Sequence, residues 1–168
     1  MTEITIRTAS TEDREILSAL IAAAYGKLAE GGHYDQRSLG VALPAMSRAN
    51  PKLLESGSYY IAEIDGRAAG CGGWTREAPG TGEVVDGVGH IRHFATHPDF
   101  LRKGVARRLL DHCLAQAATQ GVRLMKSNST LPAQAFYAAA GFVRVREIEV
   151  EMAPGAHLPA IEMERKLR

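Results

Sequence analysis

The hydrophobic pattern of this chain changes its period several times. Apolar residues that alternate with polar ones, or stand together between turn residues, predict strands at 4–7, 59–64, 67–75, 91–96, 122–126, 142–150 and 160–167. Apolar residues three and four positions apart predict helices that follow Ser10, Gly104 and Thr130. With a weaker helical pattern between 29 and 57, the order is β-α-α-β-β-β-α-β-α-β-β. This order predicts an α/β fold, with a sheet that carries helices on both faces.

Local signals predict the ends of several elements. Ser10 and Asp13 resemble a capping box at the start of the first helix, and Gly26 lies beyond its last apolar residues, where the helix should end. Asp65-Gly66 is a preferred two-residue hairpin turn. Gly121 and Gly141 should end the two later helices. The expected apolar stripe of the first helix consists of Ile16, Leu17, Leu20, Ile21 and Ala24.

The region from 29 to 57 has a less regular pattern. Gly31-Gly32 breaks the chain, and residues 36–49 predict a helix weakened by Gly40 and Pro44. Pro51 should stop it, and a short helical turn is expected at 52–55.

Two glycine- or proline-containing stretches predict loops. Residues 77–89 contain Pro79 and four glycines, which predicts a loop or a ragged extension of the next strand. Pro154, Gly155 and Pro159 predict a loop before the last strand.

The stretch from 91 to 110 predicts a strand, a short polar connection and a helix that starts at Gly104. The first N–H groups of a helix have no partner inside it, and the helix dipole adds partial positive charge there, so a phosphate group fits. Gly104 and Ala106 leave room for close approach, and Arg102, Lys103 and Arg107 add full charges. Basic residues normally favour helix C-termini, so this cluster favours a bound anion over a solvated basic turn.

Composition limits the class of protein. A length of 168 residues suits one domain, spanning 1–168, with a sizeable core. A net charge of +1 provides no general attraction for nucleic acid. The chain contains no apolar run near the ~18 residues of a membrane helix and opens with no secretory signal, so we expect a cytoplasmic protein. Cys71 and Cys113 form no disulfide framework and are expected in the core.

Two motifs together resemble those of the GNAT superfamily of acyl-CoA N-acetyltransferases. Its pyrophosphate loop follows Gln/Arg-x-x-Gly-x-Gly/Ala; Gly104 and Ala106 match, while Leu101 stands at the first position and Arg102 beside it could supply the charge. The stretch from Thr130 to Phe142 resembles Asn/Ser-x-x-Ala-x-x-Phe-Tyr-x-x-x-Gly-Phe, with Thr130 at the Asn/Ser position. Two motifs on the expected elements are much more specific than either alone.

The resemblance implies a fold and a co-substrate. The fold is a mixed, mostly antiparallel sheet of six to seven strands, in which a bulge splays strand four from strand five. The pantetheine arm of acetyl-CoA enters that gap and pairs with strand four as a surrogate strand. Carried over to this chain, the cofactor-binding residues are Phe94, Ala95, Thr96, Arg102, Lys103, Gly104, Val105, Ala106, Arg107, Asn128 and Thr130.

Acyl transfer to an amine needs a neutral amine, a stabilised carbonyl oxygen and a proton for the departing thiolate. The resemblance implies Tyr137 as the general acid; the alternative is a core aromatic residue with a solvated hydroxyl. His90 lies where some family members place the base, and an imidazole with a pKa of ~6.5 suits that task. The alternative is that solvent takes the proton.

Counting by two from His90 places Arg92, Phe94 and Thr96 on its face of the strand, provided that any bulge comes later. His93 then faces the other way and should pack beneath a helix. Three converging metal ligands are therefore not expected from His90, His93 and His97.

The acceptor is the least predictable part of the site. Segments that could line its pocket carry Tyr25, Tyr34, Trp74, Glu83 and Asp86, and a carboxylate there would suit a cationic amine. The near-neutral charge and short loops favour a small-molecule amine. The other hypotheses are a protein N-acetyltransferase, a non-catalytic acyl-CoA sensor, and an interaction domain whose basic turn docks an acidic partner. Homodimers are common in the superfamily, but no residue here predicts one.

Overall fold

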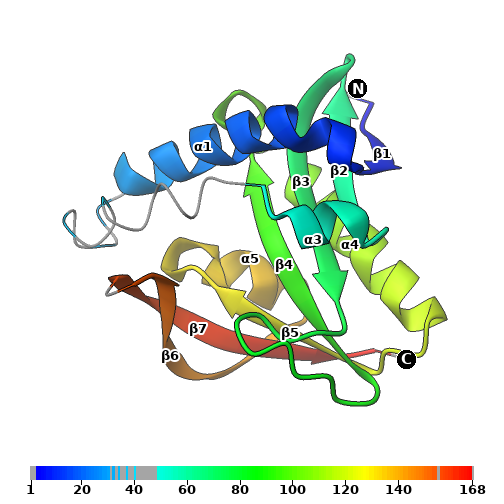
Figure 1. Ribbon diagram of the computed structural model, residues 1–168, viewed down its shortest axis with the longest axis vertical. Coiled ribbons are helices and arrows are strands. Elements are labelled where there is room, and N and C mark those ends of the chain that lie inside the picture. The colour runs from blue at the N-terminus through cyan, green and yellow to red at the C-terminus, as the bar shows by residue number, and fades with distance from the viewer. Residues whose placement is uncertain are drawn as a thin grey trace.

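The computed structural model describes residues 3–30, 32, 34, 37, 40, 49–154 and 156–167. Within them the strands form one seven-stranded sheet in the order β1-β2-β3-β4-β5-β7-β6. Neighbouring strands are antiparallel except for the parallel pair β4 and β5. The predicted mixed, mostly antiparallel sheet with helices on both faces is confirmed (Figure 1).

The strands are β1 (Thr5–Thr8), β2 (Tyr59–Ile64), β3 (Arg67–Thr75), β4 (Val88–Thr96), β5 (Leu124–Ser129), β6 (Val143–Ala153) and β7 (Ala156–Lys166). The α-helices are α1 (Arg14–Glu30), α3 (Pro51–Glu55), α4 (Val105–Thr119) and α5 (Gln134–Ala139). Short 3-10 turns are η1 (Thr11–Asp13), η2 (Pro98–Phe100) and η3 (Leu131–Ala133).

Each face of the sheet carries its own hydrophobic core. Leu109 of α4 and Tyr137 of α5 belong to the larger core, and Leu17 of α1 and Leu53 of α3 belong to the smaller one. Successive strand residues point to opposite faces, so Cys71 of β3 contacts the smaller core while its neighbours face α4. Burial on both faces explains why β2 and β3 consist almost entirely of apolar and small residues.

Elements with strong local signals lie where the sequence predicts them. The β2–β3 hairpin has its predicted bounds, and its turn residues Asp65 and Gly66 both have positive φ, 50° and 75°. Helix α3 begins at Pro51, and Asn50 Oδ1 accepts a hydrogen bond of 2.9 Å from the Lys52 backbone N–H. The C-terminus of α4 is followed by Gly121, whose φ is 86°.

Helix α1 differs from its prediction at two residues. It continues through Gly26 to Glu30, since a glycine inside a helix costs only about 1 kcal/mol and Lys27 forms an ion pair with Glu30 at 3.3 Å. Ile16, expected in the buried stripe, is 51% exposed. The neighbouring positions of the stripe, Leu17, Leu20 and Ile21, are buried as predicted.

Strand β5 extends beyond its predicted end at Lys126. It continues to Ser129 because β7 pairs with it throughout and because Ser127 and Ser129 point into the interior.

Strand β7 begins at Ala156 and includes Pro159, which was expected in a loop. β5 pairs with β7 only as far as Ser129 opposite Ile161. At Pro159, β7 therefore has β6 as its one neighbouring strand, so the missing N–H interrupts no bond to β5.

Thr130 is the N-cap residue of η3, which leads directly into α5, but its side chain makes no capping hydrogen bond. Gly141, with a φ of 92°, follows the end of α5 as predicted. The expected break at Gly31, most of the helix expected at 36–49 including Pro44, and Gly155 lie outside the described residues.

Candidate active site

Strands β4 and β5 separate after a short paired stretch. Their ladder joins Val88–His90 to residues 124–126 and then stops, although both strands continue. Among the strands that the structure describes, Ile91–Thr96 of β4 therefore pair with β3 alone, and the other backbone edge of this stretch faces the gap to β5. This is the splay that the resemblance implied.

A β-bulge accompanies the separation. Gly73 lies opposite Arg92 and Cys71 opposite Ala95, so one residue of β3 faces two residues of β4, His93 and Phe94. His93 has a φ of 53°, in the left-handed region that side chains rarely adopt.

Neighbouring residues hold the bulge in place. The buried Tyr59 hydroxyl donates a hydrogen bond of 2.8 Å to the His93 carbonyl, and the His93 ring lies 5.9 Å from that of Tyr25 on α1. At Gly72, a Cβ would come within 2.5 Å of the Phe94 ring, so the glycine makes space for the bulge. No sequence signal identified Tyr59, because its partner is set by the fold.

The direction of the β4 amides can be worked out from one bond. The His97 N–H donates to the Ala69 carbonyl of β3 at 2.8 Å. Successive backbone groups of a strand point to alternate sides, so Thr96 and Phe94 direct theirs into the gap while Ala95 faces β3. Of the three predicted residues on β4, two thus offer backbone groups to a ligand in the gap.

The bulge invalidates the counting by two along β4. It follows directly after Arg92, and one extra residue reverses the alternation of faces. Phe94 packs against the larger core near α4, whereas Arg92 bonds Thr75 on the opposite face. His93 packs against α1, beneath a helix as expected. It lies on the same face of the sheet as Arg92, whereas the counting had placed the two residues on opposite faces. The prediction that His90 and Arg92 share a face with Phe94 and Thr96 is therefore wrong.

The N-terminus of α4 has the features of an anion site. Arg102 and Gly104 have positive φ values, 62° and 81°, and no side chain caps the helix. Its first internal bond runs from the Arg108 N–H to the Gly104 carbonyl at 3.0 Å, so the preceding amides point outwards. Space in front of Gly104 is open, since an added Cβ would meet nothing within 4 Å.

The basic side chains of this loop differ in their contacts. Arg102 and Lys103 are exposed and form no ion pair with any residue that the structure describes. Arg107 instead pairs with Asp111 at 3.1 Å and donates to the Ala139 carbonyl of α5 at 3.5 Å. The backbone of this loop therefore fits a diphosphate, with Arg102 and Lys103 as its available charges.

Tyr137 is buried at 5% exposure between the rings of Phe136 and Phe142, at 5.1 and 5.4 Å. Burial raises the pKa of its hydroxyl to about 12, with the nearby Ser127 acting in the opposite direction. The Ser127 Oγ is buried and lies outside hydrogen-bond geometry with the described residues. Tyr137 is consequently protonated at neutral pH.

Burial is the main cause of the raised pKa of Tyr25 on α1, and Cys71, Tyr137 and Tyr34 raise it further.

His90 is half-buried on β4, at the last position paired with β5. Burial lowers its pKa below the ordinary 6.5, and the neighbouring charges of Lys126 and Arg92 lower it further. The imidazole is therefore neutral at pH 7 and able to accept a proton. The side chains of Asn128 and Thr130 make no hydrogen bond with the described residues.

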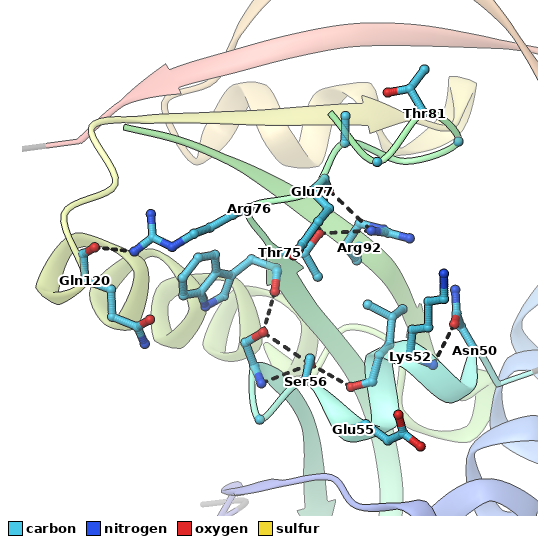
Figure 2. A pocket seen from close by; sticks show the side chains of 17 residues that line it. Asn50, Lys52, Glu55, Ser56, Thr75, Arg76, Glu77, Thr81, Arg92 and Gln120 are labelled. Atoms are coloured by element: carbon cyan, nitrogen blue, oxygen red, sulfur yellow. Dashed lines mark hydrogen bonds between the residues drawn. The ribbon is translucent and has the colours of Figure 1, made fainter. Parts of the chain in front are cut away.

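A groove of about 800 Å³ lies between α3, the end of β3 and the C-terminal end of α4 (Figure 2). It is lined by Asn50, Lys52, Leu53, Glu55, Ser56, Gly57, Ser58, Trp74, Thr75, Arg76, Glu77, Ala78, Gly80, Thr81, Gly82, Arg92 and Gln120. Its size is that of a small-molecule site.

The residues expected in the acceptor pocket are dispersed. Trp74 lines the groove, whereas Glu83 and Asp86 are exposed on the β3–β4 connection and do not. The Tyr34 hydroxyl accepts a hydrogen bond of 2.8 Å from the Leu131 N–H at the start of η3. Arg92 was missed as a groove residue, although a lone charge within an apolar strand was a usable signal.

The described residues contain neither a metal-binding cluster nor a membrane-spanning helix. Among the described residues, no three or more His, Cys, Asp or Glu side chains gather closely enough to hold a metal ion. In the described part of the chain, no helix combines the length and the apolarity needed to cross a membrane.

Comparison with known proteins agrees with the geometry. The family model for the acetyltransferase (GNAT) domain matches residues 55–144. Mycothiol acetyltransferase of Thermobifida fusca is 32% identical over 115 residues, covering 61% of this chain and 33% of the relative. The chain thus spans about a third of the length of that curated relative.

Solved structures share the fold along nearly the whole chain. A GCN5-related N-acetyltransferase from Rhodopseudomonas palustris superimposes with a TM-score of 0.79 at 20% identity, covering 99% of this chain and 98% of that one. The PaiA N-acetyltransferase of Thermoplasma acidophilum, solved with coenzyme A, gives 0.70 at 15% identity, covering 98% and 99%. The family match covers more than half of the residues, and the chain belongs to the GNAT acetyltransferase family.

Proposed function

We propose that residues 1–168 form a single N-acetyltransferase domain, which moves an acetyl group from acetyl-CoA to a primary amine of a small molecule. The observation that carries this proposal is the separation of β4 from β5 at a bulge. The strand with this edge leads through η2 to the uncapped, uncrowded N-terminus of α4, and β5 leads through η3 to α5, which carries a buried, protonated tyrosine. These are the parts needed to hold a diphosphate, an extended arm and a reacting thioester.

Acetyl-CoA supplies an activated acyl group with a thiol as the leaving group. The amides from Gly104 to Arg107, with Arg102 and Lys103, bind the diphosphate. The backbone groups of Phe94 and Thr96 pair with the arm, and one of these N–H groups polarises the thioester carbonyl.

Tyr137 acts as the general acid and His90 as the general base. The amine nitrogen forms a bond to the carbonyl carbon, and the bond from that carbon to sulfur breaks. One amine proton passes to His90, directly or through water, and Tyr137 gives its proton to the sulfur before regaining one from solvent. The raised pKa of Tyr137 keeps it protonated, and the lowered pKa of His90 keeps it unprotonated, at neutral pH.

The test is release of free thiol from acetyl-CoA with a panel of amines, using wild type, Tyr137→Phe and Tyr60→Phe. Tyr60 is a second buried tyrosine of the larger core and serves as the matched control. We expect Tyr137→Phe to lower kcat by about 100-fold or more, the usual contribution of an acid, while the acetyl-CoA dissociation constant from calorimetry stays the same. Binding without transfer to any amine would instead establish an acyl-CoA sensor.

The role of His90 has its own test. A base works when unprotonated, so kcat/KM should stay level through neutral pH and fall only below pH 6.5, because the pKa of His90 is lowered. His90→Gln should reduce the rate and remove this acid limb from the pH profile. An unchanged limb in the variant would mean that solvent takes the proton.

A further inference from the structure

Arg92 is a half-buried cation that lines the groove, and no carboxylate of the described residues forms an ion pair with it. Burial lowers the pKa of its guanidinium, and the more distant charge of Glu77 only partly opposes this. Its Nη1 donates to Thr75 Oγ1 at 2.9 Å and to the Glu77 carbonyl at 3.5 Å. No described residue forms an ion pair with it, and Nε and Nη2 have no hydrogen-bond partner in the described part of the chain. Partial burial of a cation is unfavourable unless an anion lies beside it. The groove thus offers a place for an anionic group.

The free edge of the guanidinium is suited to one kind of anion. Thr75 Oγ1 itself donates to the Glu77 carbonyl at 2.8 Å, so the corner that holds Nη1 is fixed (Figure 2). The remaining Nε and Nη2 groups form the planar fork that binds a carboxylate through two parallel hydrogen bonds. One cation with one open fork matches a single negative charge.

The other cations of the groove are less suitable. Arg76 donates to the Gln120 carbonyl and lies 5.9 Å from the centre of the Trp74 ring. Lys52 is exposed on α3 at the rim, close to the equally exposed Glu55. Arg92 is thus the cation that is both partly desolvated and available.

Its position links the groove to the proposed reaction centre. Arg92 directly precedes the bulge, while the amides that face the gap belong to Phe94 and Thr96. Arg92 and Thr75 of the groove lie on the face of α1 and α3, although Trp74 and Gln120 at the end of α4 also line it, whereas the diphosphate loop belongs to the first turn of α4. An acceptor in the groove would therefore meet the thioester from the side opposite to the cofactor.

We propose that this groove binds the acceptor and that Arg92 recognises a carboxylate on it, so that the substrate is a small molecule with both a primary amine and a carboxylate. This inference rests on the proposed acetyltransferase function. It names a substrate class, amino acids and related compounds, that the family as a whole does not specify.

The experiment compares matched pairs of acceptors, each an amino acid and the amine left after removal of its carboxylate, such as lysine and cadaverine or phenylalanine and phenethylamine. We expect wild type to prefer the amino acid by about 10- to 100-fold in kcat/KM, the range for a charge-assisted bidentate contact. Arg92→Gln should abolish this preference, because it should lower kcat/KM for the amino acid about 10- to 100-fold more than kcat/KM for the carboxylate-free amine. Arg92→Lys should restore part of the preference.

Lys52→Gln is the matched control, because it removes a positive charge from the same groove at an exposed position. It should keep the preference. Unchanged acetyl-CoA affinity in each variant shows that the protein is folded.

The outcomes separate the two proposals. Equal use of both members of each pair by wild type, or a preference that survives in Arg92→Gln, overturns the inference about Arg92 and leaves the acetyltransferase intact. Absence of acetyl transfer to every amine overturns the proposed function and this inference with it.

Discussion

Tyr59 donates its hydrogen bond across 34 positions of sequence to the carbonyl of His93, the residue at which β4 bulges. A non-glycine residue in the left-handed region costs about 1–2 kcal/mol, so the bulge needs compensating contacts. The Tyr59 hydroxyl is buried. Its hydrogen bond to His93 connects β2 to the bulge of β4. A residue with no access to ligand thereby helps to aim the amides of Phe94 and Thr96.

The variant Tyr59→Phe keeps the ring and removes only the hydroxyl. We expect the free energy of unfolding to fall by about 1–2 kcal/mol, the usual effect of losing a buried hydrogen bond. We also expect kcat to fall by about 10-fold, because the amide that polarises the thioester loses its fixed position. Urea unfolding and the thiol-release assay measure the two effects, with Tyr60→Phe as the control. A variant that loses stability but keeps its kcat would show that the hydroxyl only supports the core.

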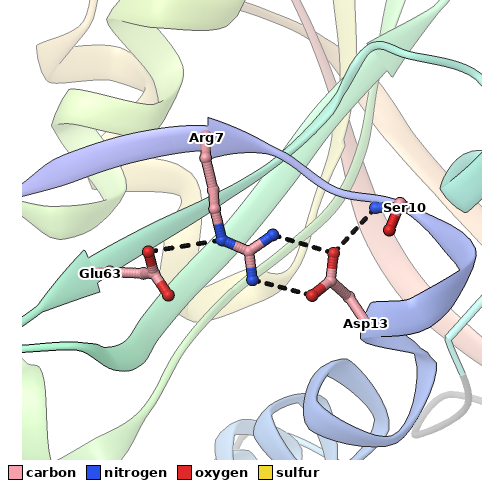
Figure 3. Close-up of polar contacts among 4 residues, drawn as sticks. All are labelled: Arg7, Ser10, Asp13 and Glu63. Atoms are coloured by element: carbon pink, nitrogen blue, oxygen red, sulfur yellow. Dashed lines mark hydrogen bonds and ion pairs between the residues drawn. The ribbon is translucent and has the colours of Figure 1, made fainter.

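Asp13 is a second residue whose role depends on distant partners (Figure 3). Its carboxylate accepts two hydrogen bonds from Arg7 of β1, at 2.8 and 3.0 Å, and a third from the Ser10 N–H at 2.8 Å. Glu63 of β2 lies 3.4 Å from the Arg7 Nε. The sequence predicted the contact to Ser10 but not the link to β1. The hydrogen bonds from Arg7 lower the pKa of Asp13, burial raises it, and the hydrogen bond from Ser10 lowers it further.

Asp13→Asn should lower the free energy of unfolding by about 1–3 kcal/mol at pH 7, through loss of a helix cap and of bonds to a charged group. The pKa of Asp13 is lower in the folded protein than its ordinary value of 3.8, so the ionised carboxylate stabilises the folded state at pH values above 3.8. This contribution is lost as the pH falls through the lower pKa of the folded state. The difference between wild type and variant should therefore shrink below about pH 4. Urea titrations across pH measure it, with exposed Glu12→Gln as the control. A constant difference down to pH 2 would contradict the assignment.

Among elements, those defined by local chemistry were predictable. The Asp65-Gly66 hairpin and the start of α4 at Gly104 follow from conformations that few residues adopt. Ends decided by tertiary partners were not. Pro159 is tolerated in β7 because β5 no longer pairs there, and Ser127 lies in a strand because β7 pairs with it.

Two glycines at helices provide a matched pair. An added Cβ meets nothing within 4 Å at Gly26 or at Gly104, but only Gly104 has a positive φ, 81°. Gly26→Ala should raise the free energy of unfolding by about 0.5–1 kcal/mol, because alanine favours the helix. Gly104→Ala should lower it by about 1 kcal/mol through backbone strain and weaken acetyl-CoA binding. Urea unfolding and calorimetry measure both, and equal effects of the two substitutions would mean that conformation at Gly104 is unimportant.

At the scale of the whole molecule, the sequence predicted the architecture but not the groove. The cofactor loop is a continuous segment with a recognisable spacing around Gly104. The groove instead combines α3, the end of β3 and Arg92, which only the folded sheet brings together. Counting along β4 was reliable up to Arg92 and failed at His93, because a bulge is a response to β3 and Tyr59 rather than a local pattern.

The separated sheet predicts how the molecule responds to its cofactor. No described strand pairs with β4 on its β5 side from Ile91 to Thr96, so Phe94 and Thr96 should exchange their amide hydrogens readily in the free protein. Coenzyme A pairs with this edge in the proposed complex, so hydrogen exchange should slow at 91–97, while β2, bonded on both sides, stays unchanged. Binding to the folded state alone should also raise the free energy of unfolding by about 2.7 kcal/mol at a ligand concentration 100 times the dissociation constant. Stabilisation of that size with no slowing at 91–97 would place the cofactor elsewhere, because a ligand in the gap cannot leave these amides in contact with water.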